Sequence, residues 1–159
     1  MARGESRTLA SHHVVYEYAN LLSCGELLTR PQSPPPPLNT HVQDGFLLGC
    51  RKMADFFLKP PQRNSVSASD YLSDPDPEFH LPVWRRWKKA VNSQLARISY
   101  ARVKSPQPWD GTTNGPLLDE FRQAWRLLLS KLEAGYRQEF DKQITERRRS
   151  PGFRNPDLT

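Results

Sequence analysis

The strongest hydrophobic pattern in the chain lies in Gln43–Leu58. Apolar residues recur here every three or four positions, which places them on one face of an α-helix. They are Phe46, Leu47, Cys50, Met53, Ala54 and Phe57. Asn39 or Thr40 can cap the start of this helix, and two prolines follow its end. We therefore predict a core helix that ends at about Leu58, on which the other elements pack.

A second helical pattern runs from Arg7 to Leu28. Its apolar positions are Leu9, Val14, Val15, Tyr18, Leu21 and Leu22. Gly25 lies near its end, and a glycine there favours an early termination. In residues 29–40, Pro31 and the run Pro34–Pro37 predict an extended polyproline connection. Such a run is more often a stiff linker than a docking segment, so we interpret it as a linker.

Two further helices are predicted in the second half of the chain. Pro82 suits the first position of a helix that continues to about Val103. Its apolar positions are Trp84, Trp87, Val91, Leu95 and Ile98. A last helix begins between Asn114 and Pro116 and reaches Arg149. Its apolar positions are Leu118, Phe121, Trp125, Leu128, Leu132, Tyr136 and Phe140.

The connection between the second and third helices is long and irregular. We expect one helical turn in it, at Ser67–Leu72, and we expect Tyr71 and Phe79 to anchor it by their burial. A long loop inside a small domain needs such anchors, because its backbone forms few regular hydrogen bonds.

Together these patterns predict an all-α fold, a four-helix-type bundle with a long proline-rich connection and a long irregular loop. At 159 residues the chain has room for one domain with a real core. We assign residues 1–150 to this single helical domain, which includes the linker at 29–40. Residues 151–159 are predicted to form a flexible tail.

The formal net charge of +6 permits a polyanionic partner without establishing one. The two cysteines have no metal-site spacing, so we interpret them as buried thiols in a reducing compartment. The first residues lack the apolar core of a signal peptide, and no run approaches the ~20 apolar residues that cross a bilayer. The expected location is therefore cytoplasmic, with no membrane contact.

The segment Trp84–Lys89 interleaves aromatic and basic residues, as nucleic-acid surfaces do. Its two tryptophans share the apolar face of the third helix, so a core position is the better interpretation for both. The cations remain candidates for phosphate contact. They are Arg85, Arg86, Lys88 and Lys89.

A second group of polar candidates surrounds two small residues, Ala96 and Ala101, where a neighbouring helix can approach closely. These candidates are Arg51, Lys52, Arg97, Tyr100 and Arg102. Two facing arginines need a carboxylate or a phosphate between them. Asp44 or Asp55 can supply the carboxylate, and a structural salt bridge is the preferred interpretation.

The four histidines do not form a metal or nucleophile pattern. They are His12, His13, His41 and His80. None has the three- or four-residue spacing of metal sites in helical bundles, and the glycines form no phosphate-binding loop. We therefore expect no metal and no cofactor.

The block Leu47–Phe57, followed by Gln94–Arg102, resembles an uncharacterised group of small bacterial helical proteins, some of them HEPN-like. In that group the first block reads approximately Leu-Leu-His-Ala-Arg-Asn before Phe-Phe, and the second ends near Ala-His-Leu-Thr-Tyr-Ala-Arg. The similarity spans about positions 40–136. It implies a helical bundle, and many HEPN proteins are metal-independent ribonucleases.

The two blocks of that group are incomplete in this chain. Arg51 matches the arginine, but Lys52 stands in place of asparagine, and Gly49 and Arg97 replace two histidines. The HEPN ribonuclease motif is an arginine with a histidine several positions later, and no histidine follows Arg51 within that reach. Metal-free RNA cleavage needs a group that moves protons near neutral pH, and histidine is the natural one. The resemblance therefore favours a non-enzymatic binding or structural module, with RNA or another protein as partner.

Two alternatives remain open. The first is a HEPN-type ribonuclease or toxin-antitoxin-related protein, which requires the fold to bring a histidine beside Arg51, from His41, His12 or His13. The second is a homodimer, with its interface at the Phe56–Phe57 end of the core helix or on the last helix.

Overall fold

The computed structural model describes residues 3–32, 34–62, 65–73, 79–96, 109–150 and 158. These residues form five α-helices and one 3-10 helix. In chain order they are α1 (Arg3–Thr29), α2 (Leu38–Leu58), η1 (Ala68–Tyr71), α3 (Pro82–Ala96), α5 (Gly111–Lys131) and α6 (Ala134–Arg149). Apart from two isolated bridge pairs, the described residues contain no extended pairing. The prediction of an all-α fold is confirmed.

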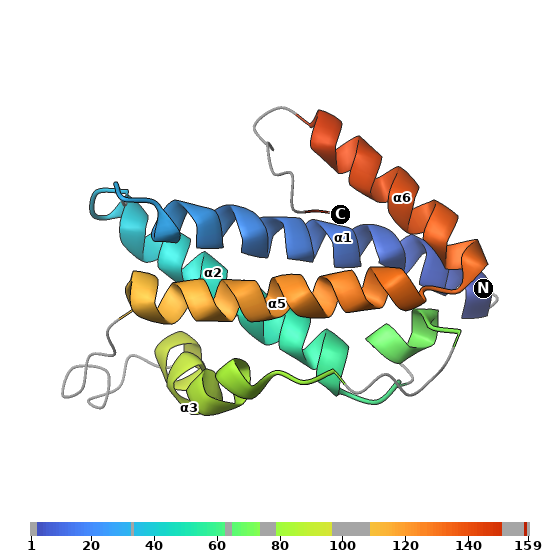
Figure 1. The fold of residues 1–159 in the computed structure, drawn as a ribbon, viewed down its shortest axis with the longest axis horizontal. Coiled ribbons are helices and arrows are strands. Elements are labelled where there is room, and N and C mark those ends of the chain that lie inside the picture. Colours follow the sequence, from blue (N-terminus) through green and yellow to red (C-terminus); the bar gives the residue numbers. More distant parts are fainter. Residues whose placement is uncertain are drawn as a thin grey trace.

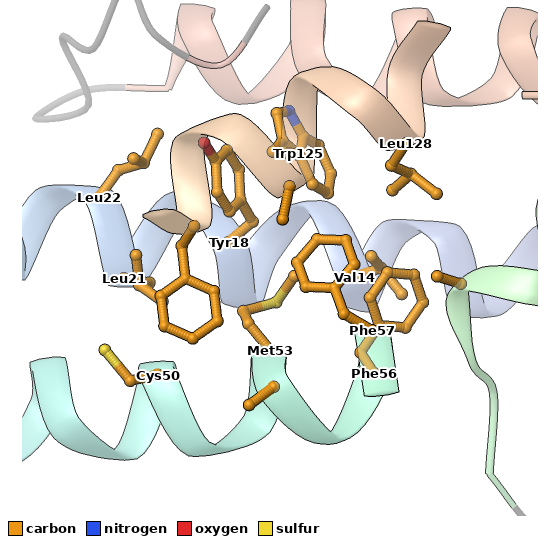
Figure 2. Close-up of a cluster of buried hydrophobic side chains, with 14 of the residues drawn as sticks. Val14, Tyr18, Leu21, Leu22, Cys50, Met53, Phe56, Phe57, Trp125 and Leu128 are labelled. Atoms are coloured by element: carbon orange, nitrogen blue, oxygen red, sulfur yellow. The ribbon is translucent and has the colours of Figure 1, made fainter. Parts of the chain in front are cut away.

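The three long helices α1, α2 and α5 enclose the core (Figure 1). α2 and α5 both run opposite to α1. α6 packs on α1, and α3 packs on α2 and α5 at the edge of the molecule. The apolar stripes predicted for the core helix and the last helix point inward, and Figure 2 shows Met53, Phe56 and Phe57 of α2 reaching toward α1.

α1 continues through Gly25 to Thr29, so the prediction of an early end at this glycine was wrong. The reason lies in packing. A Cβ atom at Gly25 would lie 2.8 Å from Leu118 Cδ1 and 2.9 Å from Phe46 Cε2. The absence of a side chain lets α1 approach α2 and α5 closely, and this gain outweighs the low helix propensity of glycine.

Gly49 has the same role on α2, and we expect Gly49→Ala to lower the free energy of unfolding by about 1–2 kcal/mol. The new Cβ would lie 3.0 Å from Leu21 Cβ and 3.2 Å from Leu21 Cα. A backbone atom cannot move aside as a flexible side chain can, so α1 and α2 must separate. Chemical denaturation measures the change.

Gly135→Ala in α6 is the matched control, because nothing lies within 4 Å of its Cβ position. Alanine favours helix over glycine, so this variant is expected to gain about 0.5 kcal/mol. Equal stability changes of the same sign in the two variants would contradict the packing argument.

The last predicted helix is two helices, so the four-helix count was wrong. Leu132 and Glu133 adopt extended backbone angles between α5 and α6. The backbone N–H of Glu133 donates to Tyr71 O at 3.0 Å, and that of Ser73 donates to Lys131 O at 3.4 Å. The segment around η1 thus replaces the helical hydrogen bonds that the break removes. No proline marks this break in the sequence, and the nearest residue of low helix propensity is Gly135, two positions beyond Glu133.

Two helix starts also differ from the prediction. α2 begins at Leu38, with Pro37 in a helical conformation at its N-cap position and no side-chain cap from Asn39 or Thr40. The proline run therefore ends in a turn and is not extended throughout. α5 begins at Gly111, because the Asp110 carboxylate accepts a hydrogen bond from the Thr112 N–H at 2.9 Å.

The anchors predicted for the long connection are confirmed. Tyr71 is fully buried and Phe79 is nearly so. The predicted turn is η1, closed by hydrogen bonds from the Ser67 N–H and hydroxyl to Asp70. For α3, Pro82 is the first residue as predicted, and the part of the predicted helix beyond Ala96 lies outside the described residues.

Trp125 lies at the centre of the aromatic core. It stacks on Tyr18 at 4.1 Å between ring centroids (Figure 2), and its Nε1–H donates to Leu158 O at 2.9 Å. Leu158 is fully buried although it belongs to the predicted tail. The rest of that tail lies outside the described residues.

Candidate binding surfaces

The outer side of α3 carries Arg85, Arg86, Lys88 and Lys89, which we call the basic face. All four side chains are exposed. The helix Pro82–Ala96 contains no acidic residue. None of the four cations forms an ion pair with a residue that the structure describes. The basic face is therefore a local concentration of uncompensated positive charge.

The inner side of α3 confirms the core interpretation for Trp84 and supports it in part for Trp87. Trp84 is 2% exposed and contacts the Phe121 ring. Trp87 is half-buried, with its ring 5.8 Å from that of Trp109, and the Arg86 guanidinium lies 5.6 Å from its centroid. The Trp84 indole presents no free face on which a base could stack, and the Trp87 indole is only partly exposed.

The N-terminus of α3 is fixed by Glu120 of α5. Its two carboxylate oxygens accept hydrogen bonds from the backbone N–H groups of Val83 and Trp84, each at 2.7 Å. The residue that precedes the helix is Leu81, which has no side-chain acceptor, so no local cap is present. A carboxylate at this position also interacts favourably with the helix dipole. No local pattern in the sequence indicates this contact.

Glu120 is 7% exposed. Burial raises its pKa above the usual value, while the hydrogen bonds from Trp84 and Val83 act in the opposite direction. The other titratable group that interacts with it is Cys50 of α2, a buried thiol whose own pKa is raised well above the usual value, first by desolvation. The cap is therefore a largely desolvated carboxylate.

The second predicted group is only partly described. Arg51 is exposed and has no ion pair with a described residue. The expected bridge to Asp55 does not form, because the Asp55 carboxylate pairs with Lys59 at 2.7 Å. Lys52 pairs with Glu17 of α1 at 2.7 Å. Arg97, Tyr100 and Arg102 lie outside the described residues.

A groove of about 720 Å³ opens between the N-terminal half of α1, the C-terminal half of α2 and the segment that leads to η1. Its apolar lining residues include Ala10, Val14, Met53, Phe56, Pro60 and Val66. Sequence analysis did not find it, because it forms only where three separate segments meet.

The charges around this groove neutralise one another. Three ion pairs join Arg7 to Asp70, Lys52 to Glu17 and Lys59 to Asp55. His13 also lines the groove. With each carboxylate already paired, the groove shows no preference for a ligand of either charge.

Of the histidines considered as partners of Arg51 in a HEPN-type pair, the structure places His41 away from it. His41 precedes Arg51 by ten residues on the same helix, which separates them by about 15 Å along its axis. His13 lines the groove, and Arg51 does not. Arg51 is thus an exposed cation without a histidine neighbour from α2.

The end of α2 that carries Phe56 and Phe57 was considered as a dimer interface. The two rings are 7% and 6% exposed, so neither is available for such an interface.

The two cysteines are free thiols. Cys50 is buried and Cys24 is partly buried, and burial raises the pKa of both thiols. Both are therefore poor nucleophiles at neutral pH.

Within the described ranges, no three His, Cys, Asp or Glu side chains gather as a metal site. None of the helices there is long and apolar enough to span a bilayer. Comparison of the chain with protein-family models, with curated proteins and with solved structures finds no match.

Proposed function

We propose that this protein is a non-enzymatic binding module that contacts the phosphate backbone of nucleic acid through the basic face of α3. The observation that carries the proposal is the basic face itself: four exposed cations on a helix without an acid. Exposed lysine and arginine side chains bind phosphates by displacing condensed counterions, and this term dominates non-specific binding.

The fixed position of α3 in the fold supports the proposal. Trp84 and Val91 anchor the inner side of the helix in the core, and Glu120 holds its N-terminus. The cations thus project from a helix of fixed position. Ion pairs neutralise the charges in the groove between α1 and α2, whereas the charges of the basic face remain available for a partner.

The test compares the wild-type protein with R85Q/R86Q/K88Q/K89Q in anisotropy titrations of a labelled DNA duplex and a labelled RNA strand. The variant is expected to bind at least about tenfold more weakly at low salt, because each lost phosphate contact removes one counterion-release term. The wild-type affinity should fall steeply with salt, and the variant should lose most of this dependence.

The matched control is R30Q/R126Q/K131Q/K142Q. It removes two arginines and two lysines that are exposed on other helices or connections. Both variants lower the formal net charge from +6 by four, to +2. The control is expected to lose less than about threefold in affinity. An equal loss in both variants, or no binding by the wild type at low salt, would refute the proposal.

A further inference from the structure

We infer that the basic face lies lengthwise in the major groove of duplex DNA. This inference rests on the proposed function and assigns it a substrate class. Three features of α3 support it: the arrangement of its four cations, the absence of an exposed aromatic face, and the hydrogen bonds to Glu120 that already occupy its N-terminus.

The cations lie along one side of the helix. At 3.6 residues per turn, Lys88 and Arg86 project about 160° apart, with Arg85 and Lys89 between them. Trp84 and Val91 mark the buried side, about 40° and 60° from Lys88, so Lys88 leaves the helix at the border of that side. A helix placed in a groove with this orientation directs one flanking cation toward each of the two phosphate backbones.

The dimensions agree with the B-form major groove. A helix with its side chains is about 10–12 Å across, and this groove is about 12 Å wide. α3 lies at the edge of the molecule, outside α2 and α5 (Figure 1), so its outer side is not covered by another described helix. The deep and narrow major groove of A-form RNA does not admit a helix.

Single strands fit the surface less well. Proteins that bind single strands combine a basic path with aromatic rings on which bases stack. Of the two indole rings on α3, that of Trp84 is in the core, and that of Trp87 is half-buried and contacts both Arg86 and Trp109. The basic face therefore offers phosphate contacts without a stacking platform.

The helix lies along the groove and does not enter it by its N-terminus. The N–H groups of Val83 and Trp84 would be the phosphate donors in an end-on arrangement. Both already donate to Glu120, whose negative charge would also repel a phosphate. The remaining way for α3 to contact the DNA is through the side of the helix, and that side carries the cations.

The experiment measures binding of the full chain to four labelled probes of equal length: a DNA duplex, an RNA duplex, single-stranded DNA and single-stranded RNA. We expect the DNA duplex to bind at least about tenfold more tightly than the RNA duplex. Four phosphate contacts predict a slope of log K against log salt near −3.6, and R86Q/K88Q is expected to reduce its magnitude by about 1.8.

A duplex with bulky groups on C5 of its pyrimidines tests the groove directly, because C5 faces the major groove. We expect at least about fivefold weaker binding to it, and no effect from a small molecule that fills the minor groove. Equal binding to both duplex types, to the substituted duplex or to single strands would overturn this inference alone. If no probe binds, the proposed function fails with it.

Discussion

Glu120→Ala is expected to lower the free energy of unfolding by about 3 kcal/mol. The substitution leaves the N–H groups of Val83 and Trp84 without their acceptors, and an unsatisfied buried polar group costs about 1–3 kcal/mol. Because the cap joins α5 to α3, the loss also loosens the helix that carries the basic face. Denaturant titration followed by far-UV circular dichroism gives the value, and amide exchange in α3 localises it.

Glu120→Gln is the control for this prediction, because its amide keeps one acceptor oxygen, and we expect a loss of about 1 kcal/mol. The raised pKa of Glu120 determines how the stability of the wild type depends on pH. The folded state holds this proton more tightly than the unfolded state, so the stabilisation is complete below the unfolded pKa and disappears as pH rises through the folded pKa.

Glutamine does not titrate, so the stability of the wild type relative to Glu120→Gln should decrease as pH rises from about 4 through the raised pKa of folded Glu120. If this stability difference instead increases over the range, the hydrogen bonds to Glu120 lower its pKa by more than burial raises it. An Ala variant as stable as wild type would contradict the capping role.

Trp125→Ala is expected to cost about 4 kcal/mol, the typical cost of a large aromatic residue in a packed core. The fully buried indole stacks on Tyr18, contacts Phe140 and donates a hydrogen bond to Leu158 O. Its removal leaves a cavity among α1, α5 and α6 and frees Leu158. Denaturant titration, with near-UV circular dichroism as a probe of aromatic packing, measures this loss.

Two variants separate the contributions to this effect. Trp125→Phe retains an aromatic ring but removes the donor to Leu158, and is expected to cost about 1–2 kcal/mol. Trp87→Ala removes a half-buried indole on the molecular edge and should cost less than Trp125→Ala. If the two alanine variants cost the same, the central position assigned to Trp125 is wrong.

Periodicity predicted the elements whose apolar residues form long stripes. The stripes of α2 and α5 lie in the core as predicted, and so do Trp84 and Val91 of α3, whereas Trp87 and Leu95 are only partly buried. The short turn at Ser67 and its anchor Tyr71 also lie where local pattern placed them. Element ends were less predictable. Gly25 is compatible with both a helix end and a close helix contact, and only its neighbours Leu118 and Phe46 decide between them.

The candidate site was predicted in part. The four cations of the basic face and the burial of Trp84 follow from the spacing of Trp84–Lys89 along a helix. The pairing of Asp55 was predicted incorrectly, because both Arg51 and Lys59 lie four residues away on the same helix, and spacing alone favours neither.

Spacing along the sequence predicts that the chain is helical, which faces of α2 and α5 are buried, and where the positive charge of α3 lies, whereas Leu9 of the predicted α1 stripe is exposed. The correct predictions follow from spacing within one segment, which sets the direction of side chains around a helix axis. Packing between segments sets the rest: the break at Leu132 and Glu133, the cap that Glu120 provides for α3, and the groove between α1 and α2. Each of these depends on groups far apart in sequence, whose contact is set by how the helices pack.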